Sequence, residues 1–276
     1  MIPKILATGL SGTIGRHLTD HVRPLEIRLD EDFSVGRAEL EDSTLIHLAA
    51  MVGEAKVRTN LALAQTINVT ASAKLARLAL ESRVRRFIYV STSHVYDLPA
   101  EPVLLTEADP TLPRGHYALQ KLLAEELIKD VFKDEPDRLI IARVFSVVDH
   151  SQPEGTLGDS LRRLCLDAHH LVHFADDVRD FLSPQIISDV LYRLAIHEAF
   201  CGVVNVCSGR PLSIRDVAAL ILPEARLSEV SPRMITGKSS VPRIVGNPRK
   251  LNAALDLKPD SLFEKFAAQM RLSRGA

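Results

Sequence analysis

The sequence predicts an α/β fold in which a doubly wound parallel sheet is followed by a smaller C-terminal lobe. Short apolar runs, typical of buried strands, alternate with longer segments of helical spacing as far as about residue 150. Such alternation implies parallel strands with helices on both faces of the sheet. Beyond residue 150 the alternation loosens, so we expect a sheet domain over residues 1–150 and a smaller lobe mainly over residues 151–276.

The elements of the sheet domain follow from local patterns. The predicted strands are the apolar runs at residues 4–8, 25–29, 45–50, 87–90 and 139–144. A helix is expected after the first strand, because Ile14, Leu18 and Val22 recur every four residues. Two longer helices are expected over residues 60–82, which contain neither Gly nor Pro, and over about 115–132.

One edge of the sheet is expected to be abbreviated. Residues 31–44, between Asp30 and the strand at Leu45, have no convincing apolar run and cannot hold a helix–strand–helix unit. In the smaller lobe, the sequence predicts a loop over 151–158, helices near 188–199 and 213–222, and a strand at 203–207.

Composition excludes several classes of protein. The net charge is −1 and tryptophan is absent, so neither a nucleic-acid-binding field nor a stacking platform is indicated. No run approaches the roughly 18 apolar residues of a membrane span. Three scattered cysteines show neither metal-ligand spacing nor a disulfide framework. We therefore expect a cytoplasmic protein without a metal, a membrane or a nucleic-acid partner.

A glycine-rich turn follows the first strand. Gly9, Gly12 and Gly15 stand in the order Thr-Gly-x-x-Gly-x-x-Gly, between a strand and an expected helix. Glycines let the backbone approach a pyrophosphate closely, and a helix N-terminus offers free N–H groups. Three glycines in an ordinary loop are the alternative. The context favours a Rossmann-type dinucleotide site.

Asp30, at the end of the second predicted strand, bears on the choice of dinucleotide. A carboxylate there can accept hydrogen bonds from the adenosine ribose and would repel a 2′-phosphate, which favours NAD over NADP. Arg28 and Arg37 lie nearby in the sequence and could instead receive a 2′-phosphate.

Three further residues form a candidate catalytic set. Tyr117 and Lys121 share one helix face at i and i+4, where an ammonium would lower the pKa of a phenol. Thr92 belongs to a run of hydroxyl residues directly after a buried strand, where ligands bind in open α/β sheets. By itself, Tyr-x-x-x-Lys is common in helices. It becomes specific in combination with the glycine turn and the hydroxyl residues.

With these motifs the sequence resembles the extended short-chain dehydrogenase/reductase family, in particular its NAD-dependent epimerase/dehydratase branch acting on nucleotide sugars. The resemblance covers nearly the whole chain and implies the catalytic residues Thr92, Tyr117 and Lys121. It also implies a cofactor site that includes the catalytic pair, the glycine turn and the segments after two strands. Its residues are Gly9, Ser11, Gly12, Thr13, Ile14, Gly15, Asp30, Leu48, Ala49, Ala50, Asn68, Tyr117, Lys121 and Phe145.

The substrate residues implied by the resemblance lie partly in a substrate-binding lobe. They are Thr92, Ser93, Ser146, Arg179 and Arg243, the two arginines as candidate ligands of a substrate diphosphate. Three positions depart from the family pattern. Ser93 and His94 stand where dehydratases have Asp-Glu, which argues against dehydration, and Ser146 replaces an asparagine that touches the substrate in related epimerases.

The resemblance implies a NAD-dependent nucleotide-sugar 4-epimerase as the first expectation. A nucleotide-sugar 4-ketoreductase using NAD(P)H is the alternative, since it needs the same residues. A non-catalytic NAD(P)-sensing or scaffold protein on the same fold is the alternative from another class. A homodimer is expected by resemblance, because relatives often pair through helices such as those at 60–82 and 115–132.

Overall fold

The structure, a computed structural model, describes residues 4–18, 22–30, 32–98, 103–149, 152, 154, 156–167, 169–237 and 243–272. The chain divides into two compact units. The first contains residues 1–97, 107–144 and 187–205, and the second contains residues 98–106, 145–186 and 206–276. The expected division at residue 150 treats the two parts as consecutive, whereas the chain returns to the first unit at residue 187.

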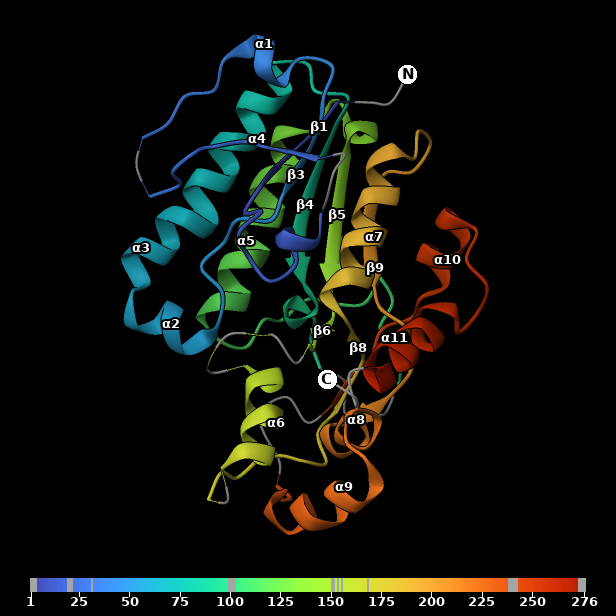
Figure 1. Cartoon of the computed structure of the whole chain (residues 1–276). Helices are drawn as coiled ribbons and strands as arrows, with labels where there is room; N and C mark the ends of the chain where they lie inside the picture. Colours follow the sequence, from blue (N-terminus) through green and yellow to red (C-terminus); the bar gives the residue numbers. More distant parts are fainter. Residues whose placement is uncertain are drawn as a thin grey trace. The chain divides into compact units, whose positions relative to one another are not determined.

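A six-stranded sheet forms the centre of the first unit (Figure 1). Its spatial order is β2 (Val22–Pro24), β1 (Ile5–Thr8), β3 (Thr44–His47), β4 (Arg86–Thr92), β5 (Leu139–Val144) and β9 (Gly202–Val206). The four pairs from β2 to β5 are parallel. The predicted Rossmann-type parallel sheet is therefore confirmed. The edge at β2 is short, as expected, because residues 32–44 supply only the one-turn helix α1 (Arg37–Leu40).

Helices cover both faces of this sheet. On one face, α4 (Ser72–Glu81) and α5 (His116–Val131) pack against alternate strand residues such as Leu45, Phe87 and Ile141, all fully or almost fully buried. On the other, α7 (Pro184–Ile196) is tied to the strands, since Thr44 donates to the carbonyl of Ala195 at 3.2 Å. Figure 1 shows α4 and α5 on one side of the strands and α7 on the other.

Two expectations near the N-terminus are wrong. The expected helix after the glycine turn is reduced, in the described residues, to a 3₁₀ turn at Gly15–His17, and Val22 begins β2; residues 19–21 lie outside the described residues. The second strand covers Val22–Pro24 rather than residues 25–29. The reason is the length of β1: pairing ends where the Leu25 N–H donates to Ala7, because β1 then enters the glycine turn.

The longer helices are confirmed. The stretch expected at 60–82 consists of α3 (Leu61–Gln65), a π-helical turn (Thr66–Ala71) and α4, and α5 occupies the expected 115–132. A short helix, α2 (Glu54–Thr59), precedes them. The π turn, a feature often found at functional sites, places Asn68 in the protein interior.

The second unit contains short strands and several helices. Its strands are β6 (Ser146–Val147) with β8 (Phe181–Leu182), and β10 (Leu212–Ser213), β7 (Val178–Arg179) and β11 (Arg243–Ile244) in a second sheet. Its helices are α6 (Leu157–Leu166), α8 (Ile214–Ile221), α9 (Glu224–Val230), α10 (Arg249–Leu255) and α11 (Ser261–Leu272). The helix expected at 213–222 is α8. The helix expected at 188–199 and the strand expected at 203–207 are α7 and β9, which belong mainly to the first unit.

Asp180 organises the backbone of the second unit. Its buried carboxylate accepts hydrogen bonds from the Ser208 N–H and hydroxyl at 2.8 and 2.7 Å, and from the N–H groups of Gly209 at 2.8 Å and Gly246 at 3.3 Å. Burial raises the pKa of Asp180 to about 6, against the opposing effect of these bonds. One side chain thus ties its own segment to the loops at 208–209 and at 246.

Among the described helices, none is long and apolar enough to cross a membrane. The described residues also contain no group of three or more His, Cys, Asp or Glu side chains that could hold a metal ion.

Candidate active site

The glycine turn packs directly against the segment that follows β3. Gly9 has φ of +76°, and a Cβ there would lie 2.6 Å from the backbone nitrogen of Ala49. A Cβ at Gly15 would lie 2.2 Å from the carbonyl oxygen of Gly9. The structure therefore brings the predicted cofactor residues of the turn together with Leu48, Ala49 and Ala50, and only glycine permits this approach.

The middle of the turn is its open side. The Gly12 N–H donates to the Gly9 carbonyl at 3.0 Å, and among the described residues a Cβ at Gly12 would meet only that same oxygen within 4 Å. This open backbone fits the pyrophosphate of a dinucleotide. Because only a 3₁₀ turn follows in the described residues, backbone N–H groups rather than a long helix dipole would hold the phosphates.

A buried histidine fixes the end of β3. His47 Nδ1 lies 2.7 Å from Thr8 Oγ1, and His47 Nε2 lies 2.9 Å from Ser72 Oγ. Burial, with the nearby charge of Lys121 as a second cause, lowers the pKa of His47 to about 3. The ring is therefore neutral at physiological pH and serves as a hydrogen-bonding link, while Thr8 accepts the N–H of Ala49 at 3.3 Å.

Asn68 holds the same segment from the helix side. Its amide accepts from the Met51 N–H at 2.8 Å, donates to the Met51 carbonyl at 3.0 Å and donates to Gln120 Oε1 at 2.9 Å. The Asn68 side chain, which the sequence assigns to the cofactor site, thus forms hydrogen bonds within the protein. A direct contact of Asn68 with the cofactor stays a prediction.

Asp30 and Arg28 lie side by side after β2. Arg28 Nη2 is 3.3 Å from Asp30 Oδ2, both side chains are exposed, and the hydrogen bond from Arg28 lowers the pKa of Asp30. The carboxylate fits an adenosine ribose and the guanidinium fits a 2′-phosphate. This position is compatible with either dinucleotide.

The candidate catalytic residues belong to two neighbouring elements. Thr92 ends β4, is almost buried, and its hydroxyl accepts the His94 N–H at 3.3 Å. Tyr117 and Lys121 lie one turn apart in α5, which packs against β4 and the 3₁₀ turn Ser93–Val95. Ser93, a predicted substrate ligand, is buried, and no partner of its hydroxyl is found in the described part of the chain.

Burial is the main cause of the pKa shifts of the candidate catalytic residues Tyr117 and Lys121. Burial lowers the pKa of Lys121 to about 7, partly offset by the carboxylate of Glu125. The Lys121 ammonium lies 4.0 Å from the centre of the Tyr89 ring, a cation–π arrangement. Burial raises the pKa of Tyr117 to about 12. The expected lowering of the tyrosine pKa by Lys121 is therefore wrong for this structure, because desolvation of the phenolate outweighs it.

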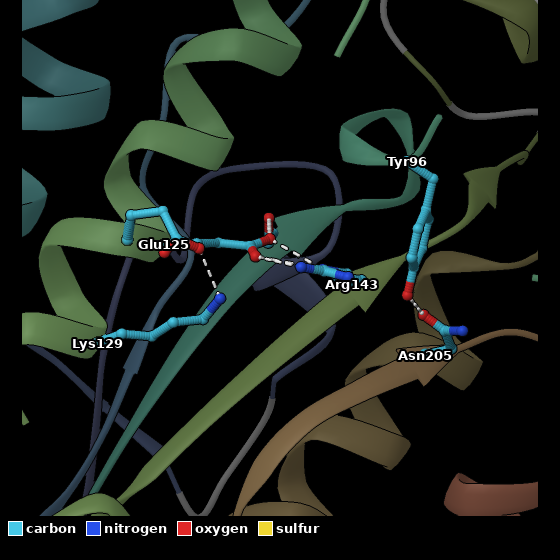
Figure 2. Close-up of polar contacts among 7 residues, drawn as sticks. Tyr96, Glu125, Lys129, Arg143 and Asn205 are labelled. Carbon is cyan, nitrogen blue, oxygen red and sulfur yellow. Dashed lines mark hydrogen bonds and ion pairs between the residues drawn. The ribbon is translucent and has the colours of Figure 1, made fainter. Parts of the chain in front are cut away.

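A buried ion pair has its acid on the same helix as Tyr117 and Lys121, and Figure 2 shows its contacts. Glu125 and Arg143 form a bidentate pair with an N–O distance of 2.7 Å, and Ser91, beside Thr92, also donates to Glu125. The Arg143 guanidinium lies 4.7 Å from the centre of the Tyr96 ring, and the Tyr96 hydroxyl donates to Asn205 at 2.6 Å. The network links α5, β4, β5 and β9.

The sequence motifs do not predict this network. The available signal is the spacing of Glu125, four residues after Lys121 and eight after Tyr117, which places an acidic group on the catalytic face of the helix. Its partner could not be inferred, because Arg143 comes from a strand whose pairing is a tertiary feature.

The remaining predicted residues lie in the second unit. Phe145 is buried, and Ser146 lies in β6, where its N–H donates to the Asp180 carbonyl at 2.9 Å. Arg179 pairs with Asp177 at 3.0 Å. Arg243 lies on β11, the strand next to the one that carries Arg179. Their roles toward cofactor and substrate stay predictions.

The fold and the site together define a class of protein: the chain is an enzyme of the extended short-chain dehydrogenase/reductase type. Its sequence matches the RmlD substrate binding domain family over residues 3–262, and the chain belongs to that family.

Named relatives place the chain among nucleotide-sugar enzymes of two kinds. The chain is 29% identical over 285 aligned residues to the GDP-6-deoxy-D-mannose reductase of Pseudomonas aeruginosa, with 94% of this chain and 93% of the relative covered. It is 24% identical over 305 residues to the UDP-glucose 4-epimerase of Azospirillum brasilense, with 92% and 84% covered. The solved structure of RMD from P. aeruginosa complexed with NADPH matches with a TM-score of 0.74 at 25% identity, covering 97% of this chain and 99% of that one.

The ion pair yields a stability prediction. Glu125→Gln or Arg143→Met alone should lower the free energy of unfolding by about 3–5 kcal/mol, because each leaves an uncompensated buried group. The double variant Glu125→Leu/Arg143→Met should lose less than the sum. Urea denaturation measures this, with Lys129→Ala as control, since that change breaks only the exposed 2.6 Å pair with Glu126. Single variants as stable as the wild type would contradict the prediction.

The lysine yields a pH prediction. A pKa lowered to about 7 means that the Lys121 ammonium is present below that pH and lost above it. If the ammonium donates to a ribose hydroxyl, the affinity for NADH should fall as the pH rises through about 7, by up to about tenfold per pH unit. Fluorescence titrations measure this affinity, and Lys121→Met should bind more weakly with a flat pH profile. A flat profile for the wild type would be inconsistent with this role.

Proposed function

We propose that this protein is a nucleotide-sugar 4-ketoreductase that uses exchangeable NAD(P)H. The observation that carries the proposal is the similarity to a GDP-6-deoxy-D-mannose reductase, which covers almost the full length of both chains. The half-buried Tyr117 phenol, whose pKa burial raises to about 12, is protonated at neutral pH and is the proposed donor of a proton to the carbonyl oxygen that is being reduced.

Each residue of the site has a defined task in this proposal. The nicotinamide cofactor, when bound, supplies the hydride. Tyr117 donates its proton to the substrate oxygen, and the Thr92 hydroxyl hydrogen-bonds the same oxygen. Lys121 holds the ribose of the nucleotide and stabilises the phenolate that remains, with a charge supported by Glu125. The glycine turn binds the pyrophosphate through its backbone.

Both dinucleotides have support at the adenosine end. The Asp30 carboxylate favours NADH, as expected from the sequence, while Arg28 beside it offers a cation to the 2′-phosphate of NADPH. The structure of the P. aeruginosa protein, which holds NADPH, adds weight to the second form. We therefore expect turnover with both cofactors.

A 4-epimerase is the second candidate. It needs the same Thr92, Tyr117 and Lys121, and the similarity to a UDP-glucose 4-epimerase over most of both chains favours it. An epimerase returns the hydride to the same sugar and retains its NAD. Tightly bound NAD released on denaturing the purified protein, together with interconversion of UDP-glucose, would select the epimerase.

The proposal predicts turnover that depends on Tyr117. GDP-6-deoxy-D-mannose should be oxidised in the presence of NAD⁺ or NADP⁺, the reverse of the proposed reaction, with reduced nicotinamide as the optical signal. Tyr117→Phe should lower kcat by about 10²–10⁴-fold while the affinity for the nucleotide persists, because only the proton transfer is removed. The matched control is Tyr192→Phe on α7, which should behave as wild type. Full turnover by Tyr117→Phe would overturn the assignment.

The expected homodimer has support on α5. Leu119, Leu123 and Leu127 follow one another at four-residue spacing and are 56%, 41% and 40% exposed, an apolar stripe on the outer face of the helix. A second copy of the chain is the proposed partner, since a stripe on a single helix suits pairing with its own copy. The same helix carries the catalytic pair on its inner face.

The stripe predicts a change of mass in solution. The wild type should sediment as a dimer and Leu123→Glu as a monomer, because a charge in the paired stripe would be desolvated without a partner. Leu166→Glu, which alters a 79% exposed leucine on α6, is the matched control and should remain dimeric. A monomeric wild type would rule out the homodimer.

A further inference from the structure

The catalytic helix α5 begins without a cap of its own. Its N-cap residue is Gly115, with φ of +100° and no side chain to accept a hydrogen bond. The first N–H groups of a helix have no partner within the helix and need an acceptor from elsewhere. The acceptor is Glu54, more than sixty residues earlier in the chain: its Oε1 accepts the His116 N–H and its Oε2 accepts the Tyr117 N–H, both at 3.0 Å.

The carboxylate and the glycine fit each other. A Cβ at Gly115 would lie 2.7 Å from Glu54 Oε2, so the absent side chain makes room for the acid. Partial burial acts to raise the pKa of Glu54, but the N–H groups of Tyr117 and His116 outweigh it and hold the pKa below its usual value. Glu54 is therefore ionised at neutral pH, the form that best matches the positive end of a helix dipole.

The chain just before Glu54 is the segment that lines the predicted nucleotide site. Leu48–Ala50 packs on the glycine turn, Met51 is held by Asn68, and Gly53, with φ of +97°, turns the chain into α2, where Glu54 is the first residue. Only two residues separate Met51 from Glu54 along the chain. Glu54 is therefore joined by a short connection to Met51, whose backbone Asn68 holds.

The Tyr117 side chain touches the same region. Met51, Val57 and Ala64 form a small buried cluster, and the Tyr117 ring packs against it. Asn68 makes a second connection, since its amide bonds both Met51 and Gln120 of α5. The backbone and the ring of the tyrosine are thus both fixed by the segment that follows β3.

We propose that Glu54 is a positioning residue that couples the nucleotide-lining segment to the placement of Tyr117. The inference rests on the proposed role of Tyr117 as proton donor. Glu54 touches neither reacting atoms nor, in this proposal, the nucleotide. It acts through the two backbone N–H groups at the start of α5, so that ordering of residues 48–51 by the nucleotide also orders the first turn of the catalytic helix.

Hydrogen exchange tests the coupling without any assay of turnover. The Tyr117 amide has its acceptor in Glu54, so its protection reports directly on this contact. In the wild type, saturating NADPH or NADH should slow exchange of the amides at residues 116–117, measured by mass spectrometry or NMR. In Glu54→Ala these amides should be unprotected with and without nucleotide. The matched control Glu126→Ala removes an exposed acid from the same helix and should keep the wild-type response.

Kinetics provides the second readout. Glu54→Ala should lower kcat by about ten- to a hundredfold, the scale expected when a catalytic group is misplaced, while the Kd for NADPH stays within about twofold. Glu54→Gln, which retains one good acceptor oxygen, should fall between Glu54→Ala and wild type. Because the Glu54 side chain is 48% exposed, these variants should fold, and circular dichroism checks this.

Three outcomes separate the inference from the proposed function. A nucleotide response of the 116–117 amides that is unchanged in Glu54→Ala would overturn the coupling. So would a wild-type kcat in that variant when Tyr117→Phe is inactive. Loss of the response in Glu54→Ala, together with full turnover by Tyr117→Phe, would support the coupling and reject the catalytic role of Tyr117.

Discussion

The buried pair between Glu125 and Arg143 is the constraint on which the arrangement of the active site depends. Removing two charges from water is costly, and the cost is offset only by close geometry and by further partners. Here the pair is bidentate, Ser91 donates to the acid, and the Tyr96 ring lies beneath the guanidinium. The partners come from α5, β4, β5 and the turn after Thr92, so the pair holds these elements against one another. That arrangement places the hydroxyl end of β4 beside the helix that carries Tyr117 and Lys121.

Burial also shifts the pKa values of three groups near this pair. Burial holds His47 neutral, Tyr117 protonated and Lys121 close to its titration point at neutral pH. The negative charge of Glu125 opposes the effect of burial on Lys121. A residue that supports the fold therefore also bears on the chemistry.

The two connections between the nucleotide-lining segment and α5 follow the same principle. Glu54 and Asn68 each satisfy backbone groups that would otherwise lack partners, and each links elements distant in sequence. In the second unit, Asp180 plays the corresponding part for the loops at Ser208, Gly209 and Gly246. In all three cases one polar side chain satisfies backbone groups of a segment distant in the sequence. This is an economical way to build a precise site from short strands and turns.

The parallel sheet, the glycine turn and the long helices could be predicted from the residues alone, because alternating periodicity, glycine spacing and helix propensity are local properties. The sequence also placed Thr92 at a strand end and Tyr117 and Lys121 on one helix face. The predictions of a helix after Gly15 and of a strand at 25–29 are wrong. The pairing of β2 with the short β1 ends where the Leu25 N–H donates to Ala7. The elements now seen as α7 and β9 were predicted to lie in the smaller lobe, because the return of a chain to an earlier sheet leaves no local signal in the sequence. The pairing of Glu125 with Arg143, the capping of α5 by Glu54 and the rise of the Tyr117 pKa on burial arise only when the chain folds. Each of these depends on groups far apart in the chain, and on a dielectric environment that exists only after folding.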